Sequence, residues 1–232
     1  MKLIYIILFS LSIGSGFTQE LNQFDANGER HGIWKKNFED TKVLRYEGEF
    51  NHGKEVGTFK FYKNIDGKAL LTATRTFNSD SDLAQVKFFS STKNLISEGQ
   101  TRGKTYVGKW LYYHNKSKQI MTEEFYNSKG ELEGEKNTYY LSGKIAKKEN
   151  YQGGVLNGEA RSFSEIGKLI SVFNYNNDVL DGPAKIYDTK GDIQMEGVYQ
   201  KDRRHGIWKF YENGILKEEQ DLTRRSNNPK EN

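Results

Sequence analysis

The sequence predicts an all-β protein, an elongated and twisted single antiparallel sheet of stacked β-hairpin repeats with about eight units. Three observations predict this fold. A unit recurs every 24 residues, as the glycines at 134, 158, 182 and 206 show. Within each unit, aromatic and branched residues alternate with a period of two, which is typical of half-buried strands. Glycines and Asn/Asp steps separate these runs and supply the positive φ that tight turns require.

Each unit between Gly130 and Gly214 has the same landmarks. An opening glycine is followed five residues later by an aromatic residue, and a second glycine comes eight or nine positions after the first. The aromatic residues are Tyr139, Phe163, Tyr187 and Tyr211, and the second glycines are Gly143, Gly167, Gly191 and Gly214. A fixed period of 20 to 50 residues signals a repeat architecture in which one small unit is stacked many times.

The alternation identifies the unit as a hairpin. After Gly167, the residues Leu169, Ser171, Phe173 and Tyr175 lie at every other position. A further tyrosine follows the second glycine by eight residues at Tyr151, Tyr175 and Tyr199. Two short strands and two turns in 24 residues make one β-hairpin per repeat.

Towards the N-terminus the repeat becomes less regular. The first copy, from Gln23, carries Gly32 and Trp34, and Phe59 lies in the second. The third copy is the poorest, because Ala84 stands where the opening glycine should be and Lys93 and Asn94 replace the turn glycine. The frame returns at Gly108 and Trp110, and the eighth unit ends near Leu222.

The two ends of the chain differ from the repeat domain at residues 19–222. Residues 1–18 have a lysine, an apolar run from Leu3 to Ile13 and small residues after it, which predicts a signal peptide. Cleavage near Thr18/Gln19 would export the protein to the periplasm, the cell surface or the medium, and a retained membrane anchor is the alternative. Residues 223–232 are polar and basic, and we expect a disordered tail.

Composition limits the classes of function. The chain has 35 basic and 31 acidic residues, a formal net charge of +4 that falls to +3 when Lys2 leaves with the signal peptide. So mild a balance argues against a nucleic-acid partner. The absence of cysteine excludes disulfides and a thiol nucleophile. Aromatic residues reach 13% and there are 23 glycines, which fits a thin repetitive β structure.

No catalytic, metal-binding or cofactor-binding residues are predicted, and we expect no enzyme activity and no cofactor. The histidines at 31, 52 and 205 each precede a glycine, and they are interpreted as turn residues that tolerate positive φ. His114 follows a predicted strand end, and no metal-ligand spacing exists within any one unit. Glu123 and Glu124 would point to opposite faces of a strand. Asp80 and Asp82 are interpreted as solvated loop acids.

The aromatic residues suggest two roles. The recurring tyrosines are expected to stack on equivalent residues of adjacent hairpins, with a carbohydrate or peptide platform as the alternative. Trp34, Trp110 and Trp208 are the candidates for contact with a partner, because they are large and unevenly distributed.

The pattern G-x-W-x-x-Y…G, with Y-x-x-G-x-x-x-G at the junctions, resembles the MORN repeat variant. The resemblance is carried by HGIWKK, GKWLYY and GIWKFYENG and extends from about Gln23 to Leu222. It implies an elongated, twisted antiparallel sheet. Proteins with this variant are often described as YwqK-type antitoxins of toxin–antitoxin systems. Here Lys136, Ala160 and Ala184 replace the tryptophan in the middle units.

We therefore expect an exported, non-enzymatic repeat protein that acts as an interaction scaffold for another protein, because extended repeat surfaces suit binding. A YwqK-type antitoxin that neutralises a toxin protein is the alternative. Binding of glycans or of a lipid surface in the cell envelope is a further alternative.

Overall fold

The computed structural model describes residues 20–78 and 81–223, and these residues form one sheet of 19 strands. Eight hairpins make up most of it. They are β2 (Arg30–Asn37) with β3 (Leu44–Asn51), β4 (Lys54–Ile65) with β5 (Lys68–Phe77), β6 (Leu83–Phe89) with β7 (Leu95–Arg102), β8 (Thr105–Tyr113) with β9 (Ile120–Tyr126), β10 (Gly134–Tyr139) with β11 (Ile145–Gln152), β13 (Gly158–Phe163) with β14 (Leu169–Asn176), β16 (Gly182–Tyr187) with β17 (Ile193–Gln200), and β18 (Arg203–Glu212) with β19 (Ile215–Asp221).

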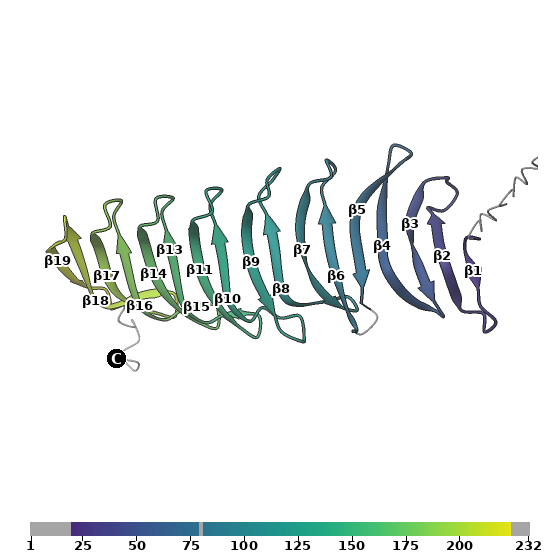
Figure 1. Cartoon of the computed structure of the whole chain (residues 1–232). Coiled ribbons are helices and arrows are strands. Elements are labelled where there is room, and N and C mark those ends of the chain that lie inside the picture. Colours follow the sequence, from purple (N-terminus) through teal and green to yellow (C-terminus); the bar gives the residue numbers. More distant parts are fainter. Residues whose placement is uncertain (1–19, 79–80, 224–232) are drawn as a thin grey trace, which may run out of the picture.

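The strands follow one another through the sheet in chain order, and all their pairings are antiparallel. Figure 1 shows the hairpins side by side along one long axis, from purple β1 (Gln23–Phe24) to yellow β19. The predicted fold class, an open antiparallel sheet of hairpin repeats, is confirmed. The predicted signal peptide and all of the predicted tail except Thr223 lie outside the described residues.

The opening glycines bend the chain. Gly134 and Gly206 have φ values of 79° and 67°, and Gly182 has φ 122°. In two units the residues just before this glycine form separate strands of two residues, β12 (Val155–Leu156) and β15 (Val179–Leu180). Because only glycine adopts positive φ without steric cost, the bend recurs wherever the glycine does.

The turns between units join each unit to the one before. The Asp178 amide donates to the Leu156 carbonyl at 2.9 Å, and the Leu156 amide donates to Asp178 Oδ1 at 2.8 Å. Asp202 makes the same pair of bonds with Leu180, at the same distances. Asp178 and Asp202 stand at the position that Gly154 has in its unit. Each carboxylate accepts a hydrogen bond from a backbone N–H of the preceding unit, which glycine cannot do.

The third hairpin lacks this bend. Ala84 replaces the opening glycine, and its strand β6 pairs without interruption with β5 from Phe77↔Ala84 to Ala73↔Phe88. The described part of the chain contains no helix with the length and apolar character needed to cross a membrane.

Candidate functional site

One residue from each long strand lies in a row across one face of the sheet, which we call the tryptophan row. The row is Trp34, Gly48, Phe59, Arg75, Val86, Gly99, Trp110, Glu124, Lys136, Glu149, Ala160, Phe173, Ala184, Gly197, Trp208 and Gln220. The face that carries it is called the tryptophan face, and most buried side chains of the described residues lie on it.

Three aromatic rings of this row, those of Phe59, Trp110 and Trp208, each lie over a glycine of the preceding strand. A Cβ atom added to Gly99 would lie 2.3 Å from the Trp110 ring, and one added to Gly197 would lie 2.4 Å from the Trp208 ring. Phe59 lies over Gly48 in the same way, also at 2.4 Å. The missing side chain makes room for the ring, so a single-layered sheet can bury an indole completely.

The indole N–H groups are also satisfied in a repeated manner. Trp110 Nε1 donates to the Gln100 carbonyl at 3.0 Å, and Trp208 Nε1 donates to the Val198 carbonyl at 3.2 Å. In both places the strand register shifts at or beside the glycine, which indicates a β-bulge. A bulge interrupts the hydrogen-bond ladder between the strands, so a backbone carbonyl is free to accept from the indole N–H.

The bend at the opening glycine folds a side chain over each of the three tryptophans. The Tyr106 ring stacks on Trp110 at 3.7 Å between ring centroids. The guanidinium carbons of Arg30 and Arg204 lie 5.0 Å and 4.5 Å from the rings of Trp34 and Trp208. Each covering residue stands four positions before its tryptophan, on the other side of the glycine.

This packing corrects part of the sequence prediction about partner contacts. Trp110 and Trp208 are 0% exposed, so neither offers a surface that a partner can touch. Both are core residues. Trp34 is half-buried, with Phe24 packed edge-on against it at 5.1 Å, and its role in partner contact stays a prediction.

The middle units fill the row without tryptophan. Lys136 lies between two buried carboxylates, with Nζ 3.0 Å from Glu124 Oε1 and with Glu149 opposite it on β11. Burial lowers the pKa of Lys136, but the hydrogen bond and charge of Glu124 outweigh this and leave its pKa raised. Further along, Phe173 pairs with Ala160, and Ala184 pairs with Gly197.

The sequence predicts that the recurring tyrosines stack on equivalent tyrosines of adjacent hairpins, and this prediction is wrong. Equivalent positions are two strands apart, about 10 Å, which is too far for ring contact. Among the described residues, Tyr199 packs instead against Trp208 at 5.2 Å, and Tyr126 packs against Tyr106 at 5.7 Å. These rings therefore close the sides of the tryptophan row.

The opposite face carries a second row, which we call the charged row. It consists of Lys35, Glu47, Lys60, Thr74, Lys87, Glu98, Leu111, Glu123, Asn137, Lys148, Arg161, Val172, Lys185, Glu196, Lys209 and Glu219. Ion pairs link neighbours, such as Lys60 and Glu47 at 3.2 Å and Lys87 and Glu98 at 3.1 Å. Glu123 lies here and Glu124 in the tryptophan row, so their predicted separation on opposite faces is confirmed.

Tyrosines reinforce the charged row. Tyr62 donates its hydroxyl to Glu47 at 2.8 Å, Tyr211 donates to Glu196 at 2.8 Å, and Tyr113 donates to Glu98. Burial, followed by the Glu47 bond, raises the pKa of Tyr62 to about 12. The same bond lowers the pKa of Glu47. Each pair is therefore a hydrogen bond between a neutral phenol and an ionised carboxylate.

The histidines occupy different environments. His52 has φ 47° and is a turn residue as predicted, whereas His31 lies in β2 and His205 in β18. His52 Nδ1 lies 2.6 Å from Asp25 Oδ2, and the rings of His31 and His52 are 4.7 Å apart. These histidines lie 21 residues apart in different units, so the sequence alone did not predict this cluster. No group of three or more His, Asp or Glu side chains within the described ranges is arranged to hold a metal ion.

Of the two loop acids considered in the sequence, Asp82 accepts from Arg102 Nε at 2.6 Å. The partner of the Asp82 carboxylate is therefore the Arg102 guanidinium, and no metal ion is needed to balance its charge. Asp80 lies outside the described residues.

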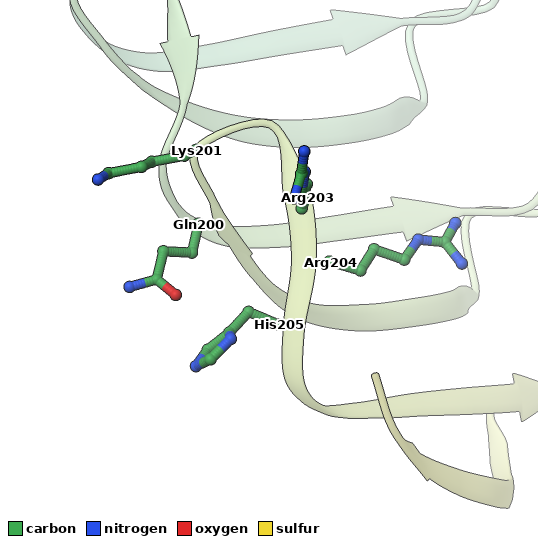
Figure 2. A pocket seen from close by; sticks show the side chains of 5 residues that line it. All are labelled: Gln200, Lys201, Arg203, Arg204 and His205. Atoms are coloured by element: carbon green, nitrogen blue, oxygen red, sulfur yellow. The ribbon is translucent and has the colours of Figure 1, made fainter. Parts of the chain in front are cut away.

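A basic hollow of about 480 Å³ lies at the last junction between units. It is lined by Gln200, Lys201, Arg203, Arg204 and His205. Figure 2 shows that Arg204 points away from Gln200 and His205. Its guanidinium covers the Trp208 ring at 4.5 Å. The sequence analysis missed this hollow, although the Arg-Arg-His run marks it.

The edge formed by the hairpin turns exposes aliphatic side chains. Leu141, in the turn between β10 and β11, is 60% exposed, and Ile166, in the turn between β13 and β14, is 68% exposed. Ile166 and Ile170 line a hollow of about 370 Å³ together with Tyr187 of the next hairpin. The sequence analysis did not select these residues, although an aliphatic residue at a turn position is itself a signal.

The sheet of stacked hairpins, with the tryptophan row on one face and the charged row on the other, defines a β-hairpin repeat protein. The family model of the MORN repeat variant matches residues 132–152 and 204–221, so the resemblance seen in the sequence is confirmed at these two places. A search of curated proteins finds no match. A solved structure of a protein of unknown function from Bacteroides fragilis is 9% identical, covering 76% of this chain and 96% of its own, with a TM-score of 0.18.

Proposed function

We propose that this chain is an exported, non-enzymatic binding module whose partner is another protein. The MORN-variant matches and the extended repeat sheet support a binding module. The observation that carries the proposal is the exposure of Leu141 and Ile166 at turns where small polar residues are the usual choice. Contiguous exposed apolar patches with a polar rim are typical of protein-binding sites.

The neighbouring hollow supports the same surface. Ile166, Ile170 and Tyr187 supply apolar walls, while Glu165, Lys168 and Asp188 supply a charged rim. An apolar centre within a polar rim is the usual anatomy of a protein interface. One aliphatic or aromatic side chain of the partner is expected to enter this hollow.

The test is a capture experiment with the full chain carrying a C-terminal tag, applied to separate envelope and cytoplasmic fractions. Mass spectrometry would identify the captured protein and the N-terminus of the bait. The variant pair Leu141→Ser and Ile166→Ser is expected to reduce capture of that protein at least tenfold. Ile207→Ser is the matched control, because Ile207 is also exposed, at 53%, but lies on β18.

Unchanged capture by the double variant would contradict the proposed surface. A bait that begins at Gln19 and holds an envelope protein would support export. An uncleaved bait that holds a toxic cytoplasmic protein would overturn export and favour the antitoxin alternative. Binding to cell-wall sugars or liposomes without a protein would favour the envelope-surface alternative.

A further inference from the structure

The third hairpin leaves an apolar cleft in the tryptophan face. The cleft has a volume of about 290 Å³ and extends from β4 to β8. Its lining is Phe61, Ala73, Thr74, Arg75, Val86, Phe88, Thr101, Gly103, Lys104 and Tyr106. It lies far along the sheet from the turns of Leu141 and Ile166, so an inference about it does not depend on the proposed function.

The cleft follows from the irregularity of the third repeat. Val86 occupies the row position where Trp110 and Trp208 stand in other units. Ala84 in place of the opening glycine removes the bend, so no preceding side chain folds over Val86 as Tyr106 folds over Trp110. The neighbouring units still supply the aromatic walls, Phe61, Phe88 and Tyr106, and the space between them stays open.

The polar groups in the cleft have unused hydrogen-bonding capacity. Arg75 is held by its Nη2 donor to the Gly103 carbonyl at 2.6 Å and by its position over the Phe77 ring at 4.8 Å. Arg75 Nε and the hydroxyl of buried Thr101 are shielded from solvent and have no hydrogen-bond partner among the residues that the structure describes. Burying a donor without a partner is unfavourable in the free energy of folding and is uncommon, so each such donor requires an explanation.

The charge of the cleft has one sign. Among the described residues that line it, Arg75 and Lys104 are the two ionised side chains, and none is a carboxylate. Within the described ranges, neither cation has a carboxylate oxygen within 4 Å, whereas neighbouring Arg102 is paired with Asp82. An apolar cleft with an unpaired guanidinium is complementary to an anion that has an apolar body.

We propose that this cleft binds a small monocarboxylate with an alkyl or phenyl body. The body lies against Phe61, Val86 and Phe88, and the carboxylate faces the Arg75 guanidinium, with the Thr101 hydroxyl as a second donor after a small rotation. The volume is at the lower end of the range for ligand sites, which restricts the ligand to a small molecule.

A titration with four probes that differ in head group or in chain length tests the ligand class. The full chain, isotopically labelled, is titrated with hexanoate, acetate, 1-hexanol and hexylamine while its NMR resonances are followed. Hexanoate is expected to move the resonances of Val86, Thr101 and Gly103 with saturation, and at least tenfold tighter than each other probe. Equal binding of 1-hexanol, or no shift with hexanoate at these residues, would overturn the proposal.

Variants locate the site. Arg75→Gln and Ala73→Ile, which fills the cleft, are each expected to weaken hexanoate binding at least tenfold. Arg102→Gln, which removes an exposed arginine of β7 that is paired with Asp82, is the control and should bind as the wild type does. Thermal unfolding checks that each variant folds. If Arg75→Gln does not fold, Ala73→Ile and Thr101→Val decide, and wild-type affinity in both would overturn the site.

Discussion

The hairpins that carry tryptophan and the fifth hairpin fill the same row in different ways. In the eighth hairpin Trp208 lies over Gly197 of the preceding strand, and in the fourth hairpin Trp110 lies over Gly99. In the fifth hairpin, Lys136 lies between Glu124 and Glu149. Neighbouring strands therefore differ together: a glycine accompanies a tryptophan, and carboxylates accompany a lysine. The row is maintained by the fit between neighbours, and no single residue type is required at a given position.

In the third unit both members of the pair of ring and glycine differ. Val86 stands in place of the large ring, and Arg75 on the preceding strand stands in place of the glycine. Gly99 on the next strand is covered by Trp110 of the fourth unit. The space above Val86 stays open as the cleft beside Arg75.

The largest effect is expected from adding a methyl group beneath a tryptophan. Gly99→Ala and Gly197→Ala each place a Cβ within 2.4 Å of a buried indole, so the ring or the strand has to shift. Overpacking of this kind costs up to about 3 kcal/mol in the free energy of unfolding. Urea unfolding followed by tryptophan fluorescence measures it.

Gly206→Ala is the matched control for these two variants. Gly206 has open space around its Cβ position but φ 67°, so its cost comes only from backbone strain, about 1 kcal/mol. Equal losses at positions 99, 197 and 206 would show that close approach to the ring is not what those two glycines provide.

The next effect concerns the charged part of the row. Lys136→Ala removes the cation and leaves the buried Glu124 carboxylate without its ion-pair partner. Because the site is partly exposed, we expect a loss of about 2 kcal/mol, below the range for fully buried pairs. Lys185→Ala is the control, since its pair with Glu196 is solvent-exposed on the charged face and is expected to contribute under about 1 kcal/mol. Equal losses in the two variants would show that the Lys136 ion pair contributes no more than an exposed one, which would contradict its role in the row.

A smaller effect is expected on the charged face. Tyr62→Phe removes the hydroxyl bond to Glu47 and should cost about 1 kcal/mol at neutral pH. Tyr187→Phe is the control, because Tyr187 has the same place in its unit but Val172 replaces the glutamate, 15 residues before it. Chemical unfolding of both variants at several pH values measures the difference.

The pH dependence of the Tyr62 effect follows from the two shifted groups. The lowered pKa of Glu47 contributes stability that is present above its unfolded value of 4.5 and is lost as the pH falls through the folded value. The raised pKa of Tyr62 contributes stability that is present below 10 and is lost as the pH rises through about 12. The difference between wild type and Tyr62→Phe should therefore be largest between these limits. A difference that grows in acid would contradict this assignment.

The sequence predicts the hairpins well because they are local. The spacing of Gly134, Gly158, Gly182 and Gly206 locates every bend in the regular units, and the alternation locates the strands. Which side chains face each other on neighbouring strands is not determined locally, because it depends on the strand register and on the β-bulges. This is why Trp110 and Trp208 were predicted as contact residues, although both are buried.

Some of this could still have been found in the sequence. Gly48, Gly99 and Gly197 each stand 11 residues before the ring that covers them, at Phe59, Trp110 and Trp208. The pentapeptide Arg-His-Gly-Ile-Trp occurs at 30–34 and again at 204–208, and it already contains the arginine that covers each tryptophan. The cleft has no such positive signal, since it results from a side chain that is missing at Val86.

The central claim is that residues in the tryptophan row fit their neighbours on adjacent strands. The most direct test transfers the pair of glycine and tryptophan to positions 124 and 136. In a Lys136→Trp background, position 124 is changed from glutamate to glycine or to alanine, and the free energies of unfolding are compared. Glycine is ordinarily the poorer strand residue. The account predicts that the glycine variant is nevertheless the more stable of the two, because only glycine leaves room for the new indole. An alanine variant of equal or greater stability would contradict it.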